Sequence, residues 1–502
     1  MSGARRDKQA GLLLDESLIF EHSSPGRLGV DLPQADAAED HLPPELVRPP
    51  IDGFPEVSEP EVLRHFLRLS QWNLGTATTF YPLGSCTMKY NPLANEVVAR
   101  LPGFAGLHPL APDACAQGVL QLCWELQEML AEVCGMDAVS LQPAAGAHGE
   151  LTGMKMVRAY HRDRGDARKV VLIPASAHGT NPASAALAGY GVQTVEANQL
   201  GLVEAATVRR AMTDQVAALM ITNPNTLGLF EREIAQIAEA VHERGGLVYF
   251  DGANLNALLG VAKPGKIGAD VLQFNLHKTF STPHGGGGPG AGPIGVRAPL
   301  APYLPGPRLA RHGDELRWSE IPERSVGRVR AFHANVGMLV RAYAYILALG
   351  GDGLTLATRM AVLAANYIRV RLAGTYQLAQ DTVCMHECVF TDKTLEPHGV
   401  KTLDVAKRLL DHGFYAPTIY FPLVVSGALM IEPTETESKE IIDAFIAAMI
   451  DIAAEAAESP AALHAAPTLT PVGRLDEARA ARRPVLRWWP KEDSPQRSTE
   501  DH

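Results

Sequence analysis

The stretch that decides the fold runs Asp270-Val-Leu-Gln-Phe-Asn-Leu-His-Lys-Thr-Phe-Ser-Thr-Pro-His-Gly-Gly-Gly-Gly-Pro-Gly290. Its first part predicts a buried strand, because the residues from Val271 to Leu276 are mostly apolar. His277, Lys278 and Thr279 come where this strand ends, and the glycines and proline that follow exclude a continuing strand or helix. Burying a lysine is costly unless its ammonium is paired or neutralised. Schiff-base chemistry requires such a lysine, whereas a solvated surface lysine is the ordinary alternative.

The composition predicts a soluble globular protein. The chain has 502 residues, of which 46% are hydrophobic and 20% charged, enough for two or three domains with a large core. Its net charge of -11 argues against non-specific nucleic-acid binding and against a basic membrane-binding surface. Six cysteines in so long a chain do not make a disulfide framework. We find no apolar run long enough for a signal peptide or a membrane span, and we expect a cytoplasmic protein.

Strands and helices alternate between residues 169 and 297. We expect strands at 169–174, 191–196, 216–222, 247–250 and 293–297, with helices at 181–189, 204–212 and 231–244 between them. Alternation of this kind, with continuously apolar strands, predicts an α/β fold with a parallel or mixed sheet that is covered on both faces. Such sheets bind ligands at the carboxyl ends of their strands, where Asn223, Asp251 and Lys278 lie.

The whole chain divides into four predicted parts. They are an N-terminal arm and helix over 1–75, a large domain over 76–325, a small C-terminal α+β domain over 326–460 and a tail over 461–502. Helices are expected at 60–70, 114–134 and 150–161 in the first two parts. The small domain should hold helices at 329–349, 354–372, 403–412 and 437–458 with strands at 385–390 and 428–431. In the tail we expect Trp488 and Trp489 to lie on the surface.

A turn of small residues, Ala145, Gly146 and Ala147, precedes a helical pattern. The free N–H groups and the positive dipole end of such a helix N-terminus can bind a phosphate. Farther along, Asp251 ends a strand, and its carboxylate can hold a ring nitrogen in the protonated form. Ala253 is small enough to let a flat ring rest against the backbone. An aspartate that only forms a turn is the ordinary alternative.

Three histidines lie near these signals. His148 follows the small-residue turn and is placed to stack on a ring, while His277 beside Lys278 is placed to donate to a phosphate. His178 lies at another loop-to-helix junction, where a hydrogen-bonded loop histidine is the ordinary interpretation. The order of small turn, Asp-x-Ala and a His-Lys pair followed by Thr279 is more specific than any single member. It predicts a site for pyridoxal phosphate, with the aldehyde on the lysine and the ring nitrogen on the aspartate.

The segment Cys384-Met-His-Glu-Cys388 carries residue types that bind metals. On the strand predicted there, alternate residues face opposite sides, so His386 shares one row with both cysteines and no second ligand pair exists. Buried structural thiols are the better interpretation, and no metal site is predicted.

Several longer motifs resemble those of the P-proteins of the glycine cleavage system, in particular the second subunit of their split bacterial form. They are Phe80-Tyr-Pro-Leu-Gly-Ser-Cys-Thr-Met-Lys-Tyr-Asn-Pro92, Gln142-Pro-Ala-Ala-Gly-Ala-His-Gly-Glu150, Ser176-Ala-His-Gly-Thr-Asn-Pro-Ala-Ser184, Thr222-Asn-Pro-Asn-Thr-Leu-Gly-Leu-Phe230, Asp251-Gly-Ala-Asn-Leu-Asn-Ala257 and the run from Asn275 to Gly290. His386-Glu-Cys-Val-Phe390 and Ile431-Glu-Pro-Thr-Glu435 extend the resemblance into the C-terminal domain, with Cys388 standing where a bulkier apolar residue is expected.

The resemblance implies the aspartate-aminotransferase-like fold of pyridoxal-phosphate-dependent transferases, fold type I. A large domain with a mixed seven-stranded sheet and a small C-terminal domain belong to that fold. The resemblance also implies a homologous P-protein subunit 1 on another chain, so the working assembly would be a heterotetramer with two copies of each subunit. Sites of this fold type lie at a subunit interface, to which the glycine-rich run after Lys278 is well placed to contribute.

The implied reaction is decarboxylation of glycine, with transfer of the aminomethyl group to the lipoyl arm of the glycine cleavage H-protein. Lys278 would hold the cofactor until glycine displaces it, and His148 or His178 would give a proton to the departing thiolate. The loop from Tyr81 to Lys89 would line the channel of the arm or bind the glycine carboxylate. The substrate candidates are Ser85, Thr87, Lys89 and Asn223.

Two other functions stay open on the sequence. Another fold type I lyase or decarboxylase, such as a threonine aldolase, would share Lys278 and Asp251. A catalytically inactive scaffold with an active partner is the second alternative, and the intact Lys278 argues against it.

Overall fold

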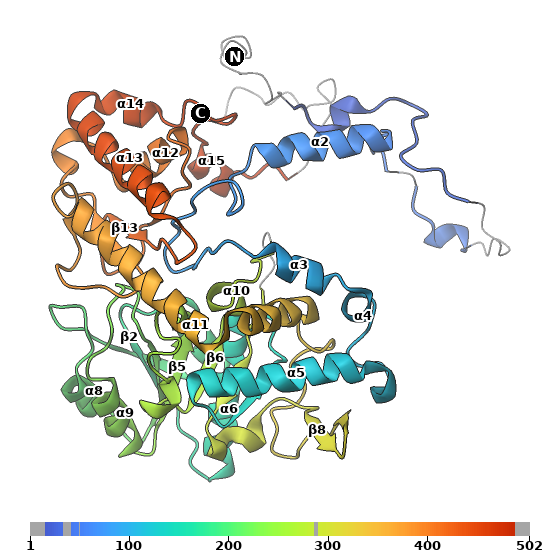
Figure 1. Ribbon diagram of the computed structural model, residues 1–502, viewed down its shortest axis with the longest axis vertical. Helices are drawn as coiled ribbons and strands as arrows, with labels where there is room; N and C mark the ends of the chain where they lie inside the picture. Colours follow the sequence, from blue (N-terminus) through green and yellow to red (C-terminus); the bar gives the residue numbers. More distant parts are fainter. Residues whose placement is uncertain (1–15, 34–41, 50, 286–289, 487–502) are drawn as a thin grey trace. The chain divides into compact units, whose positions relative to one another are not determined.

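The computed structural model describes residues 16–33, 42–49, 51–285 and 290–486, and Figure 1 labels their helices and strands. These residues form two compact units. One runs from Gly75 to His464, and the other joins the described residues up to Leu74 with those from Ala465 onward. Within the larger unit, the border predicted at residue 325 between a large and a small domain stays a prediction.

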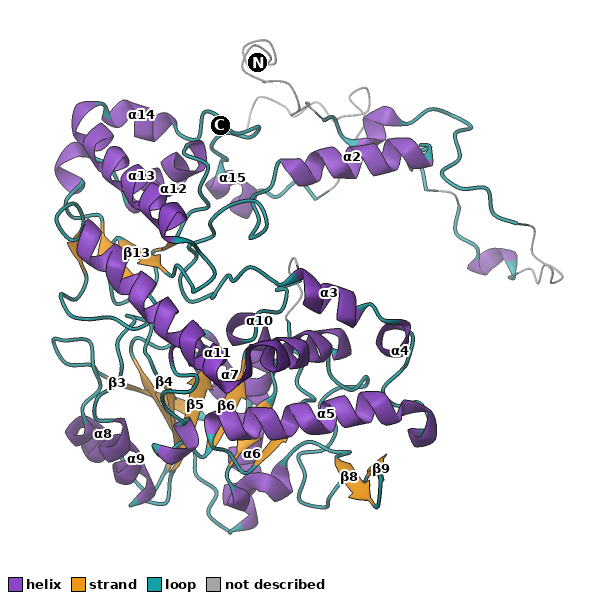
Figure 2. Cartoon of the chain, in the orientation of Figure 1, coloured by secondary structure: helices purple, strands orange, loops and turns teal. Residues whose placement is uncertain are grey.

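The larger unit is built on a seven-stranded mixed sheet (Figure 2). Its strands lie in the order β1 (Ala138–Ser140), β7 (Ile294–Val296), β6 (Val271–Phe274), β5 (Leu247–Gly252), β4 (Val216–Thr222), β2 (Val170–Pro174) and β3 (Gly191–Val195). The strands from β6 to β3 are parallel, whereas β7 is antiparallel to both neighbours. Strands β4, β5 and β6 are buried along their whole length, as strands covered on both faces are. The predicted α/β class is confirmed.

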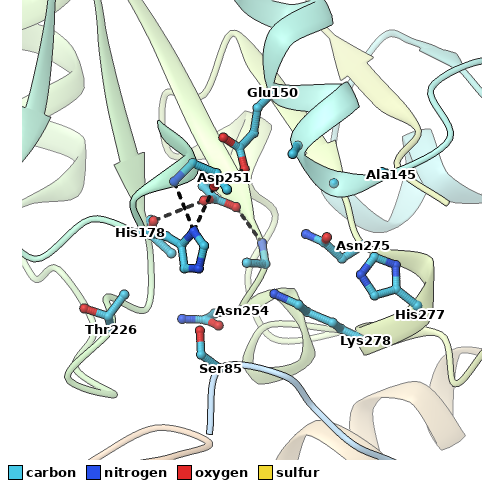
Figure 3. A pocket seen from close by; sticks show the side chains of 15 residues that line it. Ser85, Ala145, Glu150, His178, Thr226, Asp251, Asn254, Asn275, His277 and Lys278 are labelled. Atoms are coloured by element: carbon cyan, nitrogen blue, oxygen red, sulfur yellow. Dashed lines mark hydrogen bonds between the residues drawn. The ribbon is translucent and has the colours of Figure 1, made fainter. Parts of the chain in front are cut away.

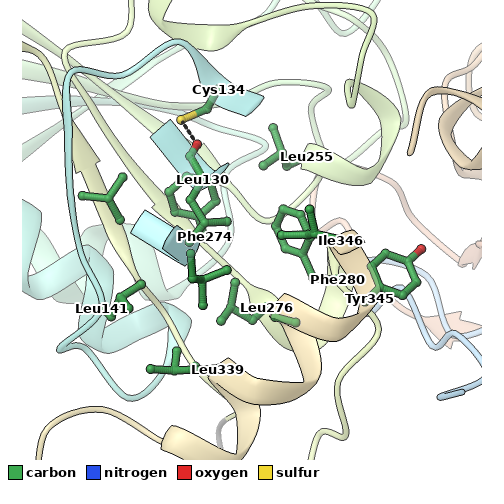
Figure 4. Packing of buried hydrophobic residues seen from close by; sticks show 14 of the residues in the cluster. Leu130, Cys134, Leu141, Leu255, Phe274, Leu276, Phe280, Leu339, Tyr345 and Ile346 are labelled. Carbon is green, nitrogen blue, oxygen red and sulfur yellow. Dashed lines mark hydrogen bonds between the residues drawn. The ribbon is translucent and has the colours of Figure 1, made fainter. Parts of the chain in front are cut away.

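Helices cover both faces of this sheet. They are α5 (Asp113–Cys134), α6 (Gly146–Asp163), α7 (Thr180–Leu187), α8 (Ala205–Ala211) and α9 (Ile234–His242). Neighbouring strand residues point to opposite layers, so Val171 and Tyr249 join the core under α6 and α7, whereas Leu172 and Val248 join the core under α8 and α9. Figure 4 shows Phe274 of β6 beside Leu130 of α5 in a third core cluster.

A four-stranded antiparallel sheet lies toward the C-terminal end of the same unit. Its order is β10 (Gln377–Leu378), β11 (Cys388–Thr391), β13 (Ala428–Ile431) and β12 (Thr418–Ile419). Helices α12 (Thr402–Asp411) and α13 (Lys439–Glu458) pack on it around buried Phe390 and Phe445. The predicted strand at 428–431 coincides with β13.

The two long helices predicted on either side of residue 350 both lie within α11 (Val336–Leu372), where a kink separates them. Gly350 interrupts it with a φ of 60° and a ψ of -175°, values that glycine adopts at little cost. The helix begins at Val336 and not at residue 329, because Ala334 has a φ of 58° and the Val329 N–H donates to Gln142 Oε1 at 2.9 Å. By length and composition α11 could cross a membrane, so the prediction that no apolar run is long enough for a membrane span is wrong, although Leu339 on this helix is fully buried in the protein core.

Near the predicted ligand site, two elements have bounds that differ from the predicted ones. Helix α6 begins at Gly146 and not at residue 150, so the small-residue turn is already its first turn. After β6 the chain forms a helical turn, α10 (Leu276–Thr279), where the sequence predicts the strand end, and the Lys278 N–H donates to the Asn275 carbonyl at 3.0 Å. Several elements have no counterpart among the predicted ones, including α3 (Leu93–Ala99), α4 (Pro102–Ala105), the hairpin β8 (Leu309–His312) with β9 (Glu315–Trp318), and α14 (Pro460–Ala465).

The smaller unit contains α2 (Glu59–Gln71) and α15 (Glu477–Arg482). The predicted helix at 60–70 is confirmed as α2, which begins with Ser58 bonded to Glu61 through its N–H at 2.9 Å and its hydroxyl at 2.7 Å. Glu16 accepts hydrogen bonds from His65 at 2.9 Å and Arg68 at 3.0 Å on the same helix. The prediction for Trp488 and Trp489 lies outside the described residues.

Helix α6 packs on the sheet at Gly153, and an alanine there should destabilise the larger unit. A Cβ at this position would lie 2.5 Å from the Tyr249 ring and 2.9 Å from Ile294 Cδ1. We expect Gly153→Ala to cost about 1–3 kcal/mol of unfolding free energy, measured by urea denaturation. Gly118→Ala in α5 is the control, because a Cβ there meets nothing within 4 Å and should stabilise by about 1 kcal/mol or less. Equal stability of both variants would contradict the packing described.

Candidate active site

A cavity of about 250 Å³ opens at the carboxyl ends of β4, β5 and β6 (Figure 3). Its wall draws on loops that follow parallel strands, on the first turn of α6 and on the loop around residue 85. The lining residues are Ser85, Ala145, Gly146, Ala147, Glu150, His178, Thr180, Thr222, Thr226, Asp251, Ala253, Asn254, Asn275, His277 and Lys278. This is the edge of the sheet where the sequence predicts a ligand site.

Lys278 reaches this cavity from the α10 turn, and Figure 3 shows its side chain directed into the space below Asp251. The turn that carries it is held by the Thr279 carbonyl, which accepts from Lys89 Nζ at 2.9 Å. Thr279 itself is fully buried and does not line the cavity. Its hydroxyl is buried without a hydrogen-bond partner, so the predicted cofactor-binding role of Thr279 stays a prediction, while its carbonyl helps to position the lysine.

Asp251 lies at the end of β5 with 2% of its surface exposed. Its carboxylate accepts from Asn181 Nδ2 at 3.0 Å, from the Ala253 N–H at 2.9 Å and from the Gln273 amide, which fixes both oxygens. No described lysine or arginine lies within 4 Å of Asp251, so its charge is available to a cationic ligand atom in the cavity. The prediction that it faces a protonated ring nitrogen fits this geometry.

Glu150 is a second buried carboxyl group beside Asp251 and was not predicted. It accepts from the Thr180 hydroxyl at 2.8 Å, from Ser184 Oγ at 3.2 Å and from Asn181 Nδ2 at 3.1 Å. The Asn181 amide therefore donates to both carboxyl groups. Burial, and then the charge of Asp251, raises the pKa of Glu150 to about 7. Its place in the first turns of α6 is visible in the sequence, but no sequence signal shows that it turns inward.

The residues that would bind a phosphate lie on the other side of the cavity. Ala145, Gly146 and Ala147 form the N-terminal turn of α6, whose first N–H groups have no partner inside the helix. Asn275 Nδ2 is buried without a hydrogen-bond partner and belongs to a residue of the same wall. Asn254 Oδ1 on the wall is likewise buried and unpaired. Buried polar atoms without a hydrogen-bond partner are available to bind a polar ligand, such as the predicted cofactor.

Of the two histidines proposed as proton donors, the structure brings His178 to the cavity. Its Nδ1 accepts the Thr180 N–H at 3.2 Å, and burial and Lys278 lower its pKa. His148 does not line the cavity, because it lies in the first turn of α6 and its Nδ1 accepts the Ala144 N–H at 3.2 Å. The predicted stacking of His148 on a ring is therefore not supported by its position, and Ala253 lines the cavity as predicted.

His277 also lines the cavity, next to Lys278. Its ring packs edge-on against His284 at 5.0 Å between centroids, and its Nδ1 is buried without a partner. Burial, and then the charge of Lys278, lowers the pKa of His277 to about 3, so the ring is neutral. Any contact with a phosphate would use a neutral imidazole.

Only some of the four residues predicted to contact the substrate line the cavity. Ser85 lines the cavity, whereas Thr87, Lys89 and Asn223 do not. The fully buried Lys89 ammonium pairs with Glu435 at 2.7 Å, and the Asn223 amide oxygen accepts the Glu231 N–H at 2.9 Å. The Lys89 ammonium is used inside the fold and is not free for a substrate, whereas Asn223 Nδ2 is buried without a hydrogen-bond partner, so the role predicted for Asn223 stays a prediction.

Comparisons with known proteins agree with one another. The family model "Glycine cleavage system P-protein" matches residues 28–315, and "Glycine dehydrogenase, C-terminal domain" matches 357–466. A probable glycine dehydrogenase (decarboxylating) subunit 2 of Listeria monocytogenes is 53% identical over 476 residues, which cover 94% of this chain and 98% of that protein. The protein of the same name from Caldanaerobacter subterraneus is 53% identical over 477 residues, with the same two coverages.

Among solved structures, an inhibitor-bound glycine decarboxylase (P-protein) of the glycine cleavage system matches with a TM-score of 0.70 and 23% identity. The match covers 82% of this chain and 93% of that one. A cysteine desulfurase from Thermococcus onnurineus matches with a TM-score of 0.60 and 15% identity, over 75% of this chain and 95% of that one. At these identities the structural matches show the shared fold.

Glu150 should make the stability of the cofactor-free protein fall as the pH rises. Its folded pKa of about 7 lies above the ordinary glutamate value of 4.5, so its contribution to stability is complete below about pH 4.5 and is lost as the pH rises through about 7. Glu150→Gln should remove on the order of 3 kcal/mol of this pH dependence, measured by urea denaturation between pH 4.5 and 7.5. Glu239→Gln on the exposed face of α9 should keep the wild-type dependence, and an unchanged slope in Glu150→Gln would contradict the assignment.

Proposed function

The chain belongs to the glycine cleavage system P-protein family, and we propose that its cavity at Lys278 is the site of glycine decarboxylation. It is a pyridoxal-phosphate-dependent glycine dehydrogenase of the decarboxylating kind, with the fold of type I enzymes, and a threonine aldolase is not favoured. The observation that carries the proposal is that Lys278 and Asp251 face one cavity that also contains the first turn of α6.

The chain's own residues fit the cofactor as follows. Lys278 Nζ would bond to the aldehyde carbon, and the Asp251 carboxylate would hold a proton on the ring nitrogen. The first N–H groups of α6, with the unpaired amide of Asn275, would bind the phosphate. Ala253 and His178 would orient the ring from the wall. The bound group supplies an electron sink for the electrons that the departing carboxylate leaves behind.

His178 is the residue we assign to proton transfer. Its Nδ1 lies 3.2 Å from the Thr180 N–H, which can donate to it, and 2.9 Å from the Thr180 hydroxyl, which donates its own proton to Glu150 and can accept from Nδ1. In the protonated ring Nε2 carries a hydrogen, and it would give that proton to a departing sulfur atom in the cavity and leave the ring neutral. The lowered pKa, caused by burial and Lys278, makes the protonated ring a stronger acid than a solvated imidazolium.

The relatives named subunit 2 imply a partner subunit within the glycine cleavage system. We propose a heterotetramer with two copies of each subunit, the lipoylated H-protein as the acceptor of the aminomethyl group, and a cytoplasmic location. Gly285 and Gly290, at the ends of the glycine-rich run, border a second cavity with Arg330, and Gly290 lies against His277 of the active-site wall. Residues 286–289 of that run, proposed as an interface wall, lie outside the described residues.

Lys278→Ala should abolish the reaction and the covalent attachment of the cofactor. With wild-type protein and pyridoxal phosphate we expect a visible absorption band that borohydride removes, leaving a stable adduct on the peptide that contains Lys278. The variant should show neither. Activity is measured as carbon dioxide released from carboxyl-labelled glycine with the partner subunit and the lipoylated carrier.

Lys263→Ala, at a half-exposed surface lysine paired with Glu132, is the control and should behave as wild type. Wild-type protein that shows no band would overturn the proposed site. Labelled carbon dioxide released without any lipoyl carrier would overturn the assignment of the H-protein as acceptor.

Substitutions of His178 and of His148 should have different effects on kcat. His178→Gln should lower kcat about 10²- to 10⁴-fold, the range for loss of a positioned general acid, with cofactor binding retained by absorption spectroscopy. His148→Gln should retain kcat, because His148 lies outside the cavity wall. The reverse order of the two effects would move the proton-transfer role to His148.

A further inference from the structure

A second cluster of ionisable side chains, His386, Glu387 and Glu432, lies directly behind the cavity wall. The antiparallel pairing of β11 with β13 puts Cys388 opposite Ile431, so the next positions in the register bring Glu387 opposite Glu432. The ring nitrogen and carboxylate oxygens of the three residues lie within 4.8 Å of one another, and all three residues are fully buried. Strand β11 begins only at Cys388, so the alternation expected at His386 does not apply there.

Each carboxyl group is bonded to the loop that carries Ser85. Glu387 Oε2 accepts the Ser85 N–H at 2.8 Å, and Glu432 Oε2 accepts the Thr87 N–H at 2.9 Å. Ser85 has a φ of 64° and Thr87 a φ of 48°, conformations that residues other than glycine keep only when their surroundings hold them. Because Ser85 lines the cavity, the two glutamates hold part of its wall in place.

The remaining polar atoms of the cluster have no hydrogen-bond partner. These are both ring nitrogens of His386, Glu387 Oε1 and Glu432 Oε1, and the His386 Nε2 to Glu432 Oε1 distance is 3.8 Å. Among the described residues, no lysine or arginine lies within 4 Å of either carboxyl group. The other ionisable groups that interact with the cluster are Lys278, Lys89, Cys86, Cys384 and Cys388. Of these, Lys89 is already paired with Glu435.

Two buried carboxyl groups that lie together without a cation cannot both be ionised at low cost, because like charges repel strongly where water is excluded. Burial raises the pKa of Glu432 to about 7, and burial together with the charge of Glu432 raises that of Glu387. Burial, and then Lys278, lowers the pKa of His386 to about 3, so the imidazole stays neutral and does not supply the missing positive charge.

We propose that Glu387 and Glu432 share one proton at neutral pH, and that this pair positions the Ser85–Thr87 loop and sets the charge that Lys278 meets. Both are positioning residues, since neither lines the cavity. When the shared proton is lost, the second negative charge stabilises the ammonium form of Lys278 and opposes its bond to the cofactor. This link to Lys278 rests on the proposed function, whereas the shared proton does not.

The shared proton can be tested on full-length, cofactor-free protein by infrared spectroscopy. A protonated carboxyl group gives a C=O stretch that a carboxylate lacks, and the difference spectrum between wild type and Glu387→Gln should contain this stretch at neutral pH. Glutamine has the shape of the protonated side chain, so its oxygen can still accept the Ser85 N–H and its amide can donate to Glu432 Oε1. If Glu387→Gln does not fold, the same difference spectrum with Glu432→Gln decides.

The holoenzyme gives the second measurement. Glu387→Gln should retain kcat, whereas Glu387→Ala should lower it about a hundredfold through a displaced loop. The pH midpoint of the absorbance change of bound cofactor should fall by about one unit in Glu387→Gln, because the pair can no longer gain a second charge. Glu231→Gln is the matched control. Glu231 is also buried and accepts a backbone N–H, that of Val203 at 2.8 Å, but it lies outside the cluster and the cavity wall.

Three results would overturn the proposal. The first is an infrared difference spectrum without the C=O stretch. The second is one equivalent of a divalent metal in purified wild-type protein that Glu387→Gln loses, since a metal would replace the proton. The third, an unchanged absorbance midpoint in Glu387→Gln despite the infrared difference, would remove the link to Lys278. A failure of the proposed function itself would instead show as the absence of any cofactor band in the wild type.

Discussion

A single buried ammonium joins the elements that surround the reactive lysine. Lys89 Nζ pairs with Glu435 Oε1 at 2.7 Å and donates to the Thr279 carbonyl at 2.9 Å and to the Tyr345 hydroxyl at 3.2 Å. Burial opposes its charge, but Glu435 and Tyr345 outweigh burial and raise the pKa of Lys89. Breaking a buried pair leaves an uncompensated charge at a cost of about 3–5 kcal/mol. The position of the turn that carries Lys278 therefore depends on this contact.

The cavity lies where it does because parallel strands end together. Strands β4, β5 and β6 run in the same direction, so the loops after them converge at one edge and bring Thr222, Asp251 and Lys278 into one wall. Helix α6 adds its N-terminus on the phosphate side. The sheet thus supplies the anionic Asp251 and the cationic Lys278, and the helix supplies N–H donors. In the described structure these groups do not pair with one another.

One pair of buried carboxyl groups lines the cavity and a second pair lies behind its wall, and the hydrogen-bond partners of the two pairs differ. Glu150 and Asp251 share the amide of Asn181, so neutral donors separate the two groups and Asp251 keeps its bonds to Ala253. Glu387 and Glu432 have no such bridge, and their facing oxygens are unpaired. Burial raises the pKa of Glu150 in the first pair and of Glu432 in the second, but only in the second pair do the facing oxygens lack hydrogen-bond donors, so that a shared proton can lie between them.

Local periodicity and strand-end chemistry were sufficient to predict β4, β13, the α/β class, and the places of Lys278 and Asp251, because those features depend on neighbouring residues along the chain. The tertiary structure alone decided that His178 and not His148 lines the cavity, that Lys89 is buried in an ion pair, and that Glu150 and Glu387 turn inward. These outcomes depend on contacts such as Ser85 with Glu387, whose partners lie far apart in sequence, and on desolvation, which no local pattern encodes.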